Sequence, residues 1–586
     1  SRCRAADFLF HYECRRPVMY YTDAVDGDRQ EVNKHFKFSD DWANFAASWK
    51  RGVVMATYTL SDVDINIPDA SDRDTLYRGL RKRLYPEIRY EDASRKRWAK
   101  ACAVMREAVK ARAEKWWKDD LTQASFRDRK LEETAWESFT AGHTKAQRVL
   151  LEKGREMVHQ DPTEALRYYL SRPYKCFVKK EVYADGTKPP RFIMCLDEEL
   201  RGIQFGFMWL VLLLIEQGTR FCNVKGKTSQ EITETVRLKF AGNDRVVETD
   251  FTSCESNITP EVKAICENSL YKVLMDVVGY GDPYHDFVDR ALGRKYVKLI
   301  GPVFTADMFH HIRMSGDLWT SLGNLYFNLC TCFSCAYSFT EYTVKNALEF
   351  IDTSLFEGDD GLFSMREYSI QDMESHATKA GFLLKFDVGN WDELSFCGNH
   401  YVHVDGDLVK YRDPIKTAAS LCVVFSPDKD TPKNLPQLQR AKAISCLLGP
   451  WVPGASVFAC CIERLTRDVR INNQYLENTG RLRKYSEYKI EGCLPPVCRI
   501  ESERDWADGV AICDKAARGI RSRKDVLRMF YSLRDTCMAS YETDHVCGSY
   551  VQEFEKSWIK PITTSHVHVH KTATYDLYRA ATYDPF

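Results

Sequence analysis

The sequence lacks an excess of charge of either sign, because its 586 residues include 83 lysines and arginines and 83 aspartates and glutamates. This balance excludes a generally basic coat for nucleic acid, although a local basic channel beside an acidic site is compatible with it. The sequence also lacks a long hydrophobic run. The longest apolar stretch, Phe205 to Ile215, is too short to cross a bilayer and predicts a buried helix.

Cysteine is abundant, with 21 residues, but we expect no disulfide framework in a chain of this length. The thiols are scattered, and several lie in apolar segments, so they should be reduced in a cytosolic compartment. Cys330, Cys332 and Cys335 lie close together, yet the second ligand pair typical of structural zinc is absent, so the spacing does not favour zinc. The same applies to two C-terminal groups, Cys493 with Cys498 and His566 with His568 and His570.

The most informative segment is FEGDDGLF, in which Asp359 and Asp360 lie between Gly358 and Gly361. Apolar residues on both sides of the glycines predict a β-hairpin with two adjacent carboxylates at its tip. Adjacent carboxylates repel each other unless a cation lies between them, so the hairpin predicts a site for divalent metal ions. An ordinary acidic turn gives the same short pattern, and the interpretation therefore depends on its context.

Two upstream segments supply that context. VVETDF predicts a strand that ends near Asp250, whose carboxylate can join the acidic pair around two metal ions. RMSGDLWTSLGN predicts a flexible loop at Ser315 and Gly316, followed by a largely apolar helix. Thr320 and Asn324 share one face of that helix, where a hydroxyl and an amide suit hydrogen bonding to sugar hydroxyls.

In this order, the three segments resemble the palm motifs of the RNA-dependent RNA polymerases of positive-strand RNA viruses. Asp250 matches the first acid of motif A, SGDLWTSLGN matches the motif B pattern S-G-x(3)-T-x(3)-N, and FEGDDGLF matches motif C. The sequence is most similar to tombusvirus-like and nodavirus-like polymerases. The resemblance implies RNA-directed RNA synthesis by two-metal-ion nucleotidyl transfer from NTPs to an RNA 3′-hydroxyl. It makes Asp250, Asp359 and Asp360 ligands of two Mg²⁺ or Mn²⁺ ions.

KCFVKKEVYADGTKPPRFI resembles motif F of the same family, a basic fingers element along the path of incoming triphosphates. The matching cations are Lys179, Lys180, Lys188 and Arg191, which would neutralise the triphosphate. We expect Glu181 to orient them by ion pairing. A basic hairpin at a solvated sheet edge is the alternative interpretation.

AGFLLKFD resembles motif D and makes Lys385 the candidate general acid that protonates the departing pyrophosphate. ELSFCGNHY resembles motif E, the hairpin that supports the primer strand, through Phe396, Cys397 and Gly398.

The chain departs from the family at Glu255, where most relatives carry Asp. The resemblance implies that this side chain recognises the ribose 2′-hydroxyl together with the motif B serine and asparagine. Glu keeps the carboxylate acceptor, so we expect Glu255, Ser315 and Asn324 to select ribonucleotides over deoxynucleotides.

The resemblance implies a right-hand polymerase of the α/β (α+β) class, with an antiparallel palm sheet flanked by helices. We expect an N-terminal extension packing on the fingers at 1–150, fingers at 151–245, a palm at 246–410 with a fingers insertion at about 262–305, and a thumb with a C-terminal tail at 411–586. Proline-rich loops such as 426–436 should separate the thumb helices.

Residues 77–118 are rich in Lys and Arg at helical spacing, including Arg95, Lys96 and Arg97. A long solvated helix that packs on the fingers is the simpler interpretation. Contact with the template strand or with a membrane surface is the alternative.

The implied partners are template and product RNA, NTPs, and viral or host replication-complex proteins in the host cytoplasm. Membrane association would be indirect or through sequence outside this chain, whose start at Ser1 suggests a processed product, a readthrough portion or a trimmed fragment. Two other functions stay open. One is a reverse transcriptase, which shares the palm, and the other is a non-catalytic RNA-binding replication scaffold on a polymerase fold.

Overall fold

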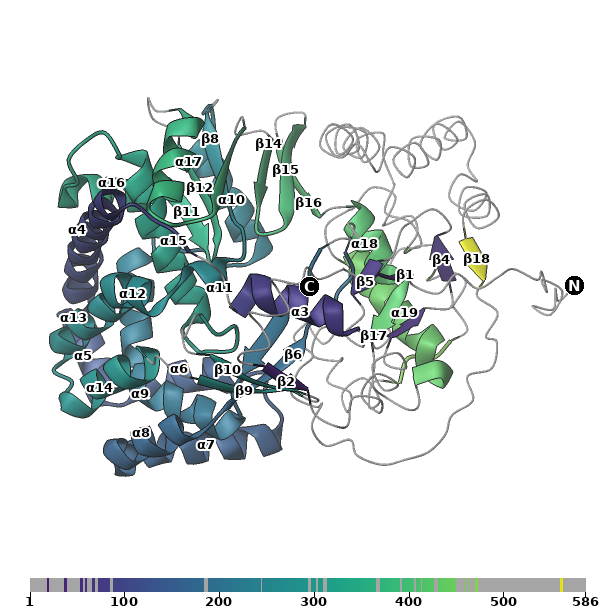
Figure 1. Ribbon diagram of the computed structural model, residues 1–586, viewed down its shortest axis with the longest axis horizontal. Helices are drawn as coiled ribbons and strands as arrows, with labels where there is room; N and C mark the ends of the chain where they lie inside the picture. Colours follow the sequence, from purple (N-terminus) through teal and green to yellow (C-terminus); the bar gives the residue numbers. More distant parts are fainter. Residues whose placement is uncertain are drawn as a thin grey trace, which may run out of the picture.

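The computed structural model describes residues 72–448 with short gaps, and outside that range only a few strands and single residues (Figure 1). The described part combines helices with antiparallel and mixed sheets, so the chain has a mixed helix-and-strand fold. The thiols at 493 and 498, the histidines at 566, 568 and 570, and the C-terminal tail lie outside the described residues. The gaps within 72–448 are residues 85–87, 184–187, 244, 294–296, 302–303, 309–312, 365–368, 390–392, 405–406, 413 and 426–430.

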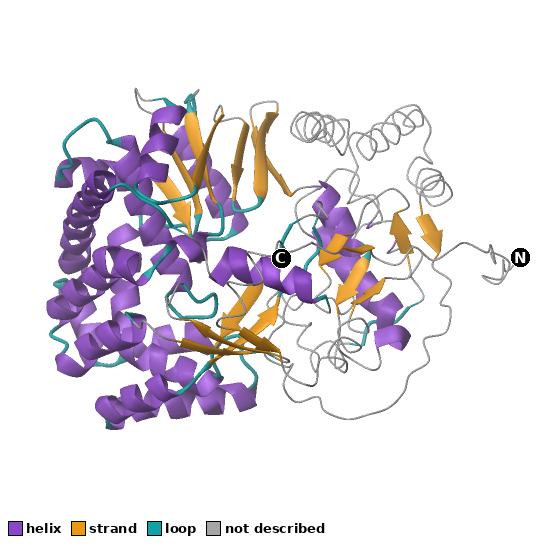
Figure 2. Ribbon diagram, in the orientation of Figure 1, coloured by secondary structure: helices purple, strands orange, loops and turns teal. Residues whose placement is uncertain are grey.

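Two long helices, α4 (Asp92–Trp117) and α9 (Glu198–Thr219), pack against each other in the helical part of the molecule (Figure 2). α9 is apolar on nearly every side and mostly buried, which confirms the helix predicted for residues 205–215. None of the helices in the described ranges is long and apolar enough to cross a membrane. The other helices before residue 245 are α3 (Arg73–Leu84), α5 (Asp120–Arg127), α6 (Lys130–Thr140), α7 (Lys145–Gln160), α8 (Pro162–Ser171) and α10 (Ser229–Phe240).

A four-stranded antiparallel sheet carries the segments VVETDF and FEGDDGLF. Its strand order is β11-β12-β8-β13, and the hairpin predicted around the acidic pair is confirmed as β11 and β12. Helix α15, which was predicted after the Ser-Gly loop, packs on this sheet together with α16 and α17, and α10 shares a buried apolar cluster with its strands. These elements are β8 (Val246–Phe251), β11 (Ser354–Glu357), β12 (Asp360–Ser364), β13 (Leu384–Gly389), α15 (Thr320–Ala336), α16 (Val344–Thr353) and α17 (Ile370–Lys379).

A second, mixed sheet has the strand order β2-β10-β9-β6-β7. Its strands β6 and β7 are the predicted basic hairpin, and β9 and β10 come from the chain between β8 and α15. The intervening chain therefore leaves the four-stranded sheet and joins the hairpin. The strands are β2 (Phe36–Phe38), β6 (Tyr174–Val178), β7 (Phe192–Cys195), β9 (Val297–Ile300) and β10 (Phe304–Met308), and the helices that precede β9 are α11 (Cys254–Asn257), α12 (Pro260–Lys263), η1 (Ala264–Asn268), α13 (Ser269–Val278), α14 (Asp282–Phe287) and η2 (Val288–Leu292).

The hairpin predicted for ELSFCGNHY is confirmed as β14 (Glu393–Phe396) and β15 (Asn399–Val404), to which β16 (Asp407–Arg412) adds a third strand. Both turn residues, Cys397 and Gly398, have positive φ values of 53° and 67°, as two-residue hairpin turns require.

The boundary predicted for the proline-rich loop at 426–436 is wrong, because α19 (Thr431–Leu448) begins inside it and contains Pro436. Proline is tolerated in the first turn of a helix, and Pro436 lies only slightly further in. The remaining described elements are α18 (Pro414–Leu421), β1 (Val18–Tyr20), β3 (Val53–Met55), β4 (Tyr58–Leu60), β5 (Asn66–Pro68), β17 (Val423–Phe425) and β18 (Ile559–Pro561).

The basic stretch on α4 is not uniformly solvated. Arg95 is buried, with its guanidinium carbon 4.3 Å from the ring centroid of Tyr90 and 4.8 Å from that of Phe382. Arg97 donates a 2.9 Å hydrogen bond to the Thr340 carbonyl. Arg95 is therefore not solvated as the simpler interpretation expects, and the alternative of a template or membrane contact does not apply to it either, because its charge is held between aromatic rings.

Candidate active site

Three charged residues form a row across the four-stranded sheet. Lys385 on β13 is paired with Asp250 on β8, and on the other side Thr249 is paired with Gly361. The same antiparallel register places Asp360, the residue before Gly361, beside Asp250, the residue after Thr249. Paired residues point to the same face about 5 Å apart, so the row presents two carboxylates and an ammonium group together.

The turn that carries Asp359 is fixed by glycine and by α15. Gly358 has a φ of 59°, which L-residues with side chains rarely adopt. A Cβ atom on Gly361 would lie 2.7 Å from Thr249 Oγ1, so β12 can approach β8 this closely only with glycine there. Asn328 Nδ2 of α15 donates a 2.8 Å hydrogen bond to the Asp359 carbonyl. The position of the turn therefore depends on the helix behind it.

The carboxylates of this turn interact unfavourably with one another. Burial, followed by the charges of Asp359 and Asp250, raises the pKa of Asp360 to about 7. Burial also raises the pKa of Asp359, with contributions from Glu255 and Asp250, although Asp359 keeps exposed surface. A divalent cation would relieve this repulsion.

The carboxylate oxygens of Asp250, Asp359 and Asp360 do not all lie within 4.8 Å of one another. Among the described residues, one group of three potential metal ligands meets that limit, and it consists of cysteines elsewhere in the fold.

Cations of the basic hairpin lie opposite the acidic residues. Glu181 pairs with Lys179 at 2.8 Å and with Arg191 at 3.4 Å, which confirms the predicted ion pairing. Burial lowers the pKa of Arg191, but the charges of Glu181, Glu255 and Asp359 outweigh it and raise the pKa. Burial lowers the pKa of Lys180 to about 8. Arg191 of this hairpin thus interacts electrostatically with the turn that carries Asp359.

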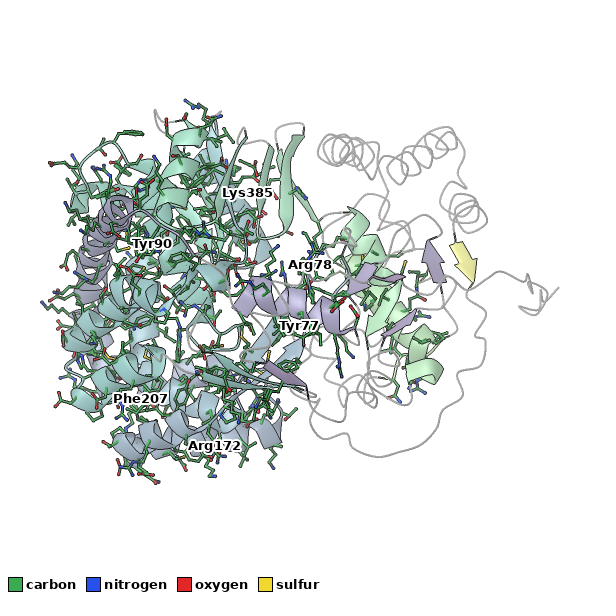
Figure 3. The ribbon with its side chains drawn as sticks, viewed as in Figure 1. Tyr77, Arg78, Tyr90, Arg172, Phe207 and Lys385 are labelled. Atoms are coloured by element: carbon green, nitrogen blue, oxygen red, sulfur yellow. The ribbon has the colours of Figure 1, made fainter. Side chains whose placement is uncertain are left out.

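Helix α3 adds cations that sequence reasoning did not assign to the site. Arg83 Nη1 lies 2.7 Å from Glu255 Oε1. Burial lowers the pKa of Lys82, and the charges of Arg83, Lys188 and Arg78 lower it further. The helix therefore continues the basic surface of the hairpin (Figure 3, with Arg78 on α3 and Lys385 on the sheet above it). The sequence held a usable signal, because Arg78, Arg81 and Lys82 are spaced three and four apart and share one helical face.

The predicted sugar-binding residues are held by different partners. Ser315 Oγ accepts a 2.9 Å hydrogen bond from the Met194 amide of β7, and the Gly316 amide donates to the Met194 carbonyl at 2.7 Å. Thr320 Oγ1 donates to the Met314 carbonyl at 2.6 Å. The Ser-Gly loop is therefore attached to the basic hairpin.

Asn324, in the segment SGDLWTSLGN, has a side-chain donor that makes no hydrogen bond with any described residue. This donor is Nδ2, whereas Oδ1 accepts a 3.1 Å hydrogen bond from Arg313 Nε. Arg313 also donates its backbone amide to the Glu255 carbonyl at 3.4 Å. Arg313 therefore connects Asn324 to the backbone of Glu255.

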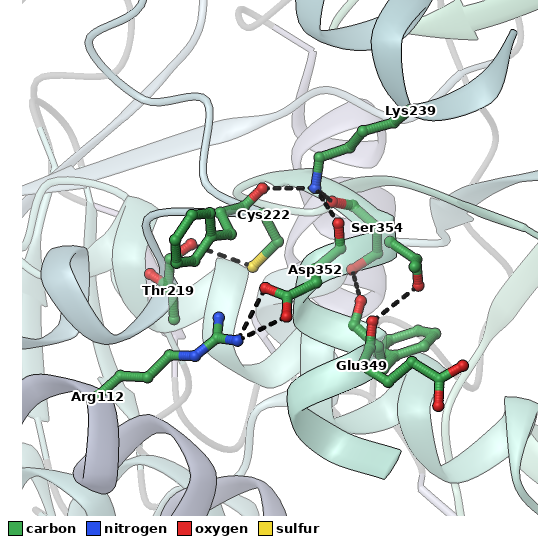
Figure 4. A network of polar contacts seen from close by, with 10 residues as sticks. Arg112, Thr219, Cys222, Lys239, Glu349, Asp352 and Ser354 are labelled. Carbon is green, nitrogen blue, oxygen red and sulfur yellow. Dashed lines mark hydrogen bonds and ion pairs between the residues drawn. The ribbon is translucent and has the colours of Figure 1, made fainter. Parts of the chain in front are cut away.

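A polar network supports the base of the β11–β12 hairpin (Figure 4). Lys239 Nζ donates to the carbonyls of Phe221, Asp352 and Ser354 at 2.6, 2.7 and 2.9 Å. Arg112 of α4 lies 2.8 Å from both carboxylate oxygens of Asp352. These contacts join α4 and α10 to the start of β11 and so fix the direction of the hairpin.

A scan of protein-family models finds no match to the chain, and a search of curated proteins finds none that is similar to it.

Proposed function

We propose that this chain is an RNA-directed RNA polymerase that transfers nucleotides from NTPs to an RNA 3′-hydroxyl. The observation that carries the proposal is the row formed by Asp360, Asp250 and Lys385, with Asp359 in the adjoining turn and Arg191 facing it. Acids at a sheet edge opposite a basic hairpin suit the handling of a metal-bound triphosphate.

A right-hand polymerase architecture is part of the same proposal. The four-stranded sheet would be the palm, and the mixed sheet that contains the basic hairpin would belong to the fingers. The chain between β8 and α15 contributes β9 and β10 to the mixed sheet, which supports a fingers insertion within the palm. The three-stranded sheet of β14–β16 would support the primer strand.

The acidic residues fit a pair of divalent cations. Asp250, Asp359 and Asp360 supply carboxylate oxygens, the ligands that Mg²⁺ prefers, and the raised pKa values of the last two reflect burial and then repulsion between the carboxylates, which a divalent cation would offset. When bound, the ions would supply positive charge at the attacking 3′-hydroxyl and at the departing pyrophosphate.

The protein's own residues would bind and orient the substrate. Arg191 and Lys179 would hold the triphosphate, and the cations of α3 would extend that contact. Lys385, beside Asp250, would hold the proton that the pyrophosphate takes up. Glu255 and the free Nδ2 of Asn324 would receive the ribose hydroxyls, so that ribonucleotides are preferred.

The test is incorporation of labelled nucleotides on a single-stranded RNA template with Mg²⁺ or Mn²⁺, using wild type, Asp359→Asn and Asp387→Asn. Asp387 is an exposed carboxylate of the same sheet and serves as the matched control. We expect ribonucleotide products from wild type and the control and none from Asp359→Asn. Equal use of deoxynucleotides would favour a reverse transcriptase. A folded wild type that binds RNA without making product would favour the scaffold.

A further inference from the structure

Three buried thiols from distant parts of the chain meet in the core. Cys102 lies on α4, Cys266 on η1 and Cys330 on α15, and their relative exposures are 1%, 1% and 0%. Their sulfur atoms all lie within 4.8 Å of one another. Cysteine is often buried as a small apolar residue, but burial alone does not bring three sulfur atoms to one point.

The spacing fits a single ion. A zinc–sulfur bond of about 2.3 Å places the sulfurs of a shared tetrahedral ion about 4 Å apart, which lies within the observed limit. Thiolates select soft ions such as Zn²⁺ and Cu⁺ over the hard ions that carboxylates bind. We propose that Cys102, Cys266 and Cys330 form a structural site for one thiophilic metal ion, Zn²⁺, separate from the acidic residues of the palm.

The surroundings suit a metal–thiolate group. The three thiols are within hydrogen-bonding reach of one another, and the Tyr326 hydroxyl is within hydrogen-bonding reach of Cys330. The Tyr326 hydroxyl is thus next to the sulfurs and would be available as a fourth ligand. Zn²⁺ with three thiolates carries one net negative charge, and Arg106, one turn after Cys102, supplies a neighbouring positive charge.

The backbone around Cys266 has an unusual conformation that contributes to the site. η1 is a π-helical segment within the continuous helix formed by α12, η1 and α13. Such segments are rare and recur at functional sites, because the extra residue changes the direction of the side chains. Here, η1 directs Cys266 to the other thiols and Glu267 to the ion pair with Arg313.

A bound ion would join three elements that already pack together, with α4 and α15 also linked by the 3.2 Å hydrogen bond from Trp98 Nε1 to Thr331 Oγ1. α4 precedes all strands of the four-stranded sheet in the chain, η1 lies between β8 and β9, and α15 carries the Asn328 contact to the Asp359 turn. The ion would therefore fix the position of α15 relative to the N-terminal helices. Because the site is buried, it would be filled during folding and would resist chelators in the native state.

The experiment measures the metal content of the full chain, expressed with added Zn²⁺, reduced, and dialysed against EDTA. We expect about one zinc per chain in wild type and in Cys335→Ser, and loss of most of it in Cys266→Ser. Cys335 is the matched control because it is a buried thiol of α15 outside the cluster. Zinc-edge X-ray absorption of wild type should show three sulfur neighbours at about 2.3 Å.

The absorption measurement needs only wild type, so it decides the matter even if Cys266→Ser does not fold. Folded wild type without zinc or copper, or a disulfide between two of the three cysteines, would overturn the proposal. Bound copper in place of zinc would support the three-cysteine site and would show that its ion is Cu⁺. Since none of these measurements uses nucleotides, their outcome is independent of the proposed polymerase activity.

Discussion

Replacing Asp360 by Asn should stabilise the protein in the absence of divalent cations. Asp360 has a pKa of about 7, whereas its usual value is 3.8. At about 1.4 kcal/mol per pKa unit, keeping it ionised at pH 8 would cost roughly 4 kcal/mol if the group were fully shielded from water. Asp360 is partly exposed, so solvent screening should reduce this cost to about 1–2 kcal/mol.

The effect has a defined dependence on pH. A carboxyl group whose pKa is higher in the folded than in the unfolded chain makes the free energy of unfolding fall as pH rises from about 4 to about 7. The gain from Asp360→Asn should therefore be near its full size at pH 8 and nearly absent at about pH 3. Mn²⁺ should raise the melting temperature of wild type at pH 8 and have much less effect on the variant.

The assay is thermal unfolding in EDTA at both pH values, with Asp387→Asn as the control carboxylate on the same sheet. We expect the melting temperature of Asp360→Asn to exceed that of the control at pH 8 only. A variant that is no more stable than the control at pH 8, or that is equally stabilised at both pH values, would refute the electrostatic account of this turn.

Three further predictions concern neighbouring residues. Gly361→Ala should destabilise the fold by about 1–3 kcal/mol in denaturant titration, because its Cβ would overlap Thr249; an unchanged midpoint would contradict the close approach. Arg95→Ala should lower stability by about 1–3 kcal/mol while Lys96→Ala stays within about 0.5 kcal/mol, and Arg95→Ala should leave the salt dependence of RNA binding unaltered. Glu255→Gln should reduce discrimination between ribo- and deoxynucleotides by about 10-fold or more, because one charge-assisted hydrogen bond is lost. The measurement is a competition between the two substrates, and undiminished discrimination would show that Glu255 does not recognise the sugar.

Local sequence patterns predicted the elements whose geometry is set within a few residues. Glycines at 358 and 361 predicted the acidic hairpin, and the helix after the Ser-Gly loop followed from its apolar run. In both cases turn chemistry and hydrophobic periodicity act over short distances along the chain. The hairpin of β14 and β15 was instead expected from the resemblance of ELSFCGNHY to motif E.

Contacts between segments far apart in the chain could not be predicted from local sequence patterns. Arg83 and Glu255 are 172 positions apart, and neither has a neighbouring residue that predicts the other. Arg95 looked solvated because its neighbours are charged, yet aromatic rings from α17–β13 and from the loop before α4 enclose it. The spacing of Cys330, Cys332 and Cys335 suggested one group, whereas tertiary packing brings only Cys330 to Cys102 and Cys266.

The most direct test of the central claim is whether the template dictates which nucleotide is incorporated. Wild type, supplied with Mn²⁺ and all four NTPs one at a time, should incorporate only GMP on poly(C) and only UMP on poly(A), and Asp359→Asn should incorporate neither. Addition of the same nucleotide to both templates, or no incorporation on either by a folded protein that binds RNA, would contradict template-directed synthesis by this site.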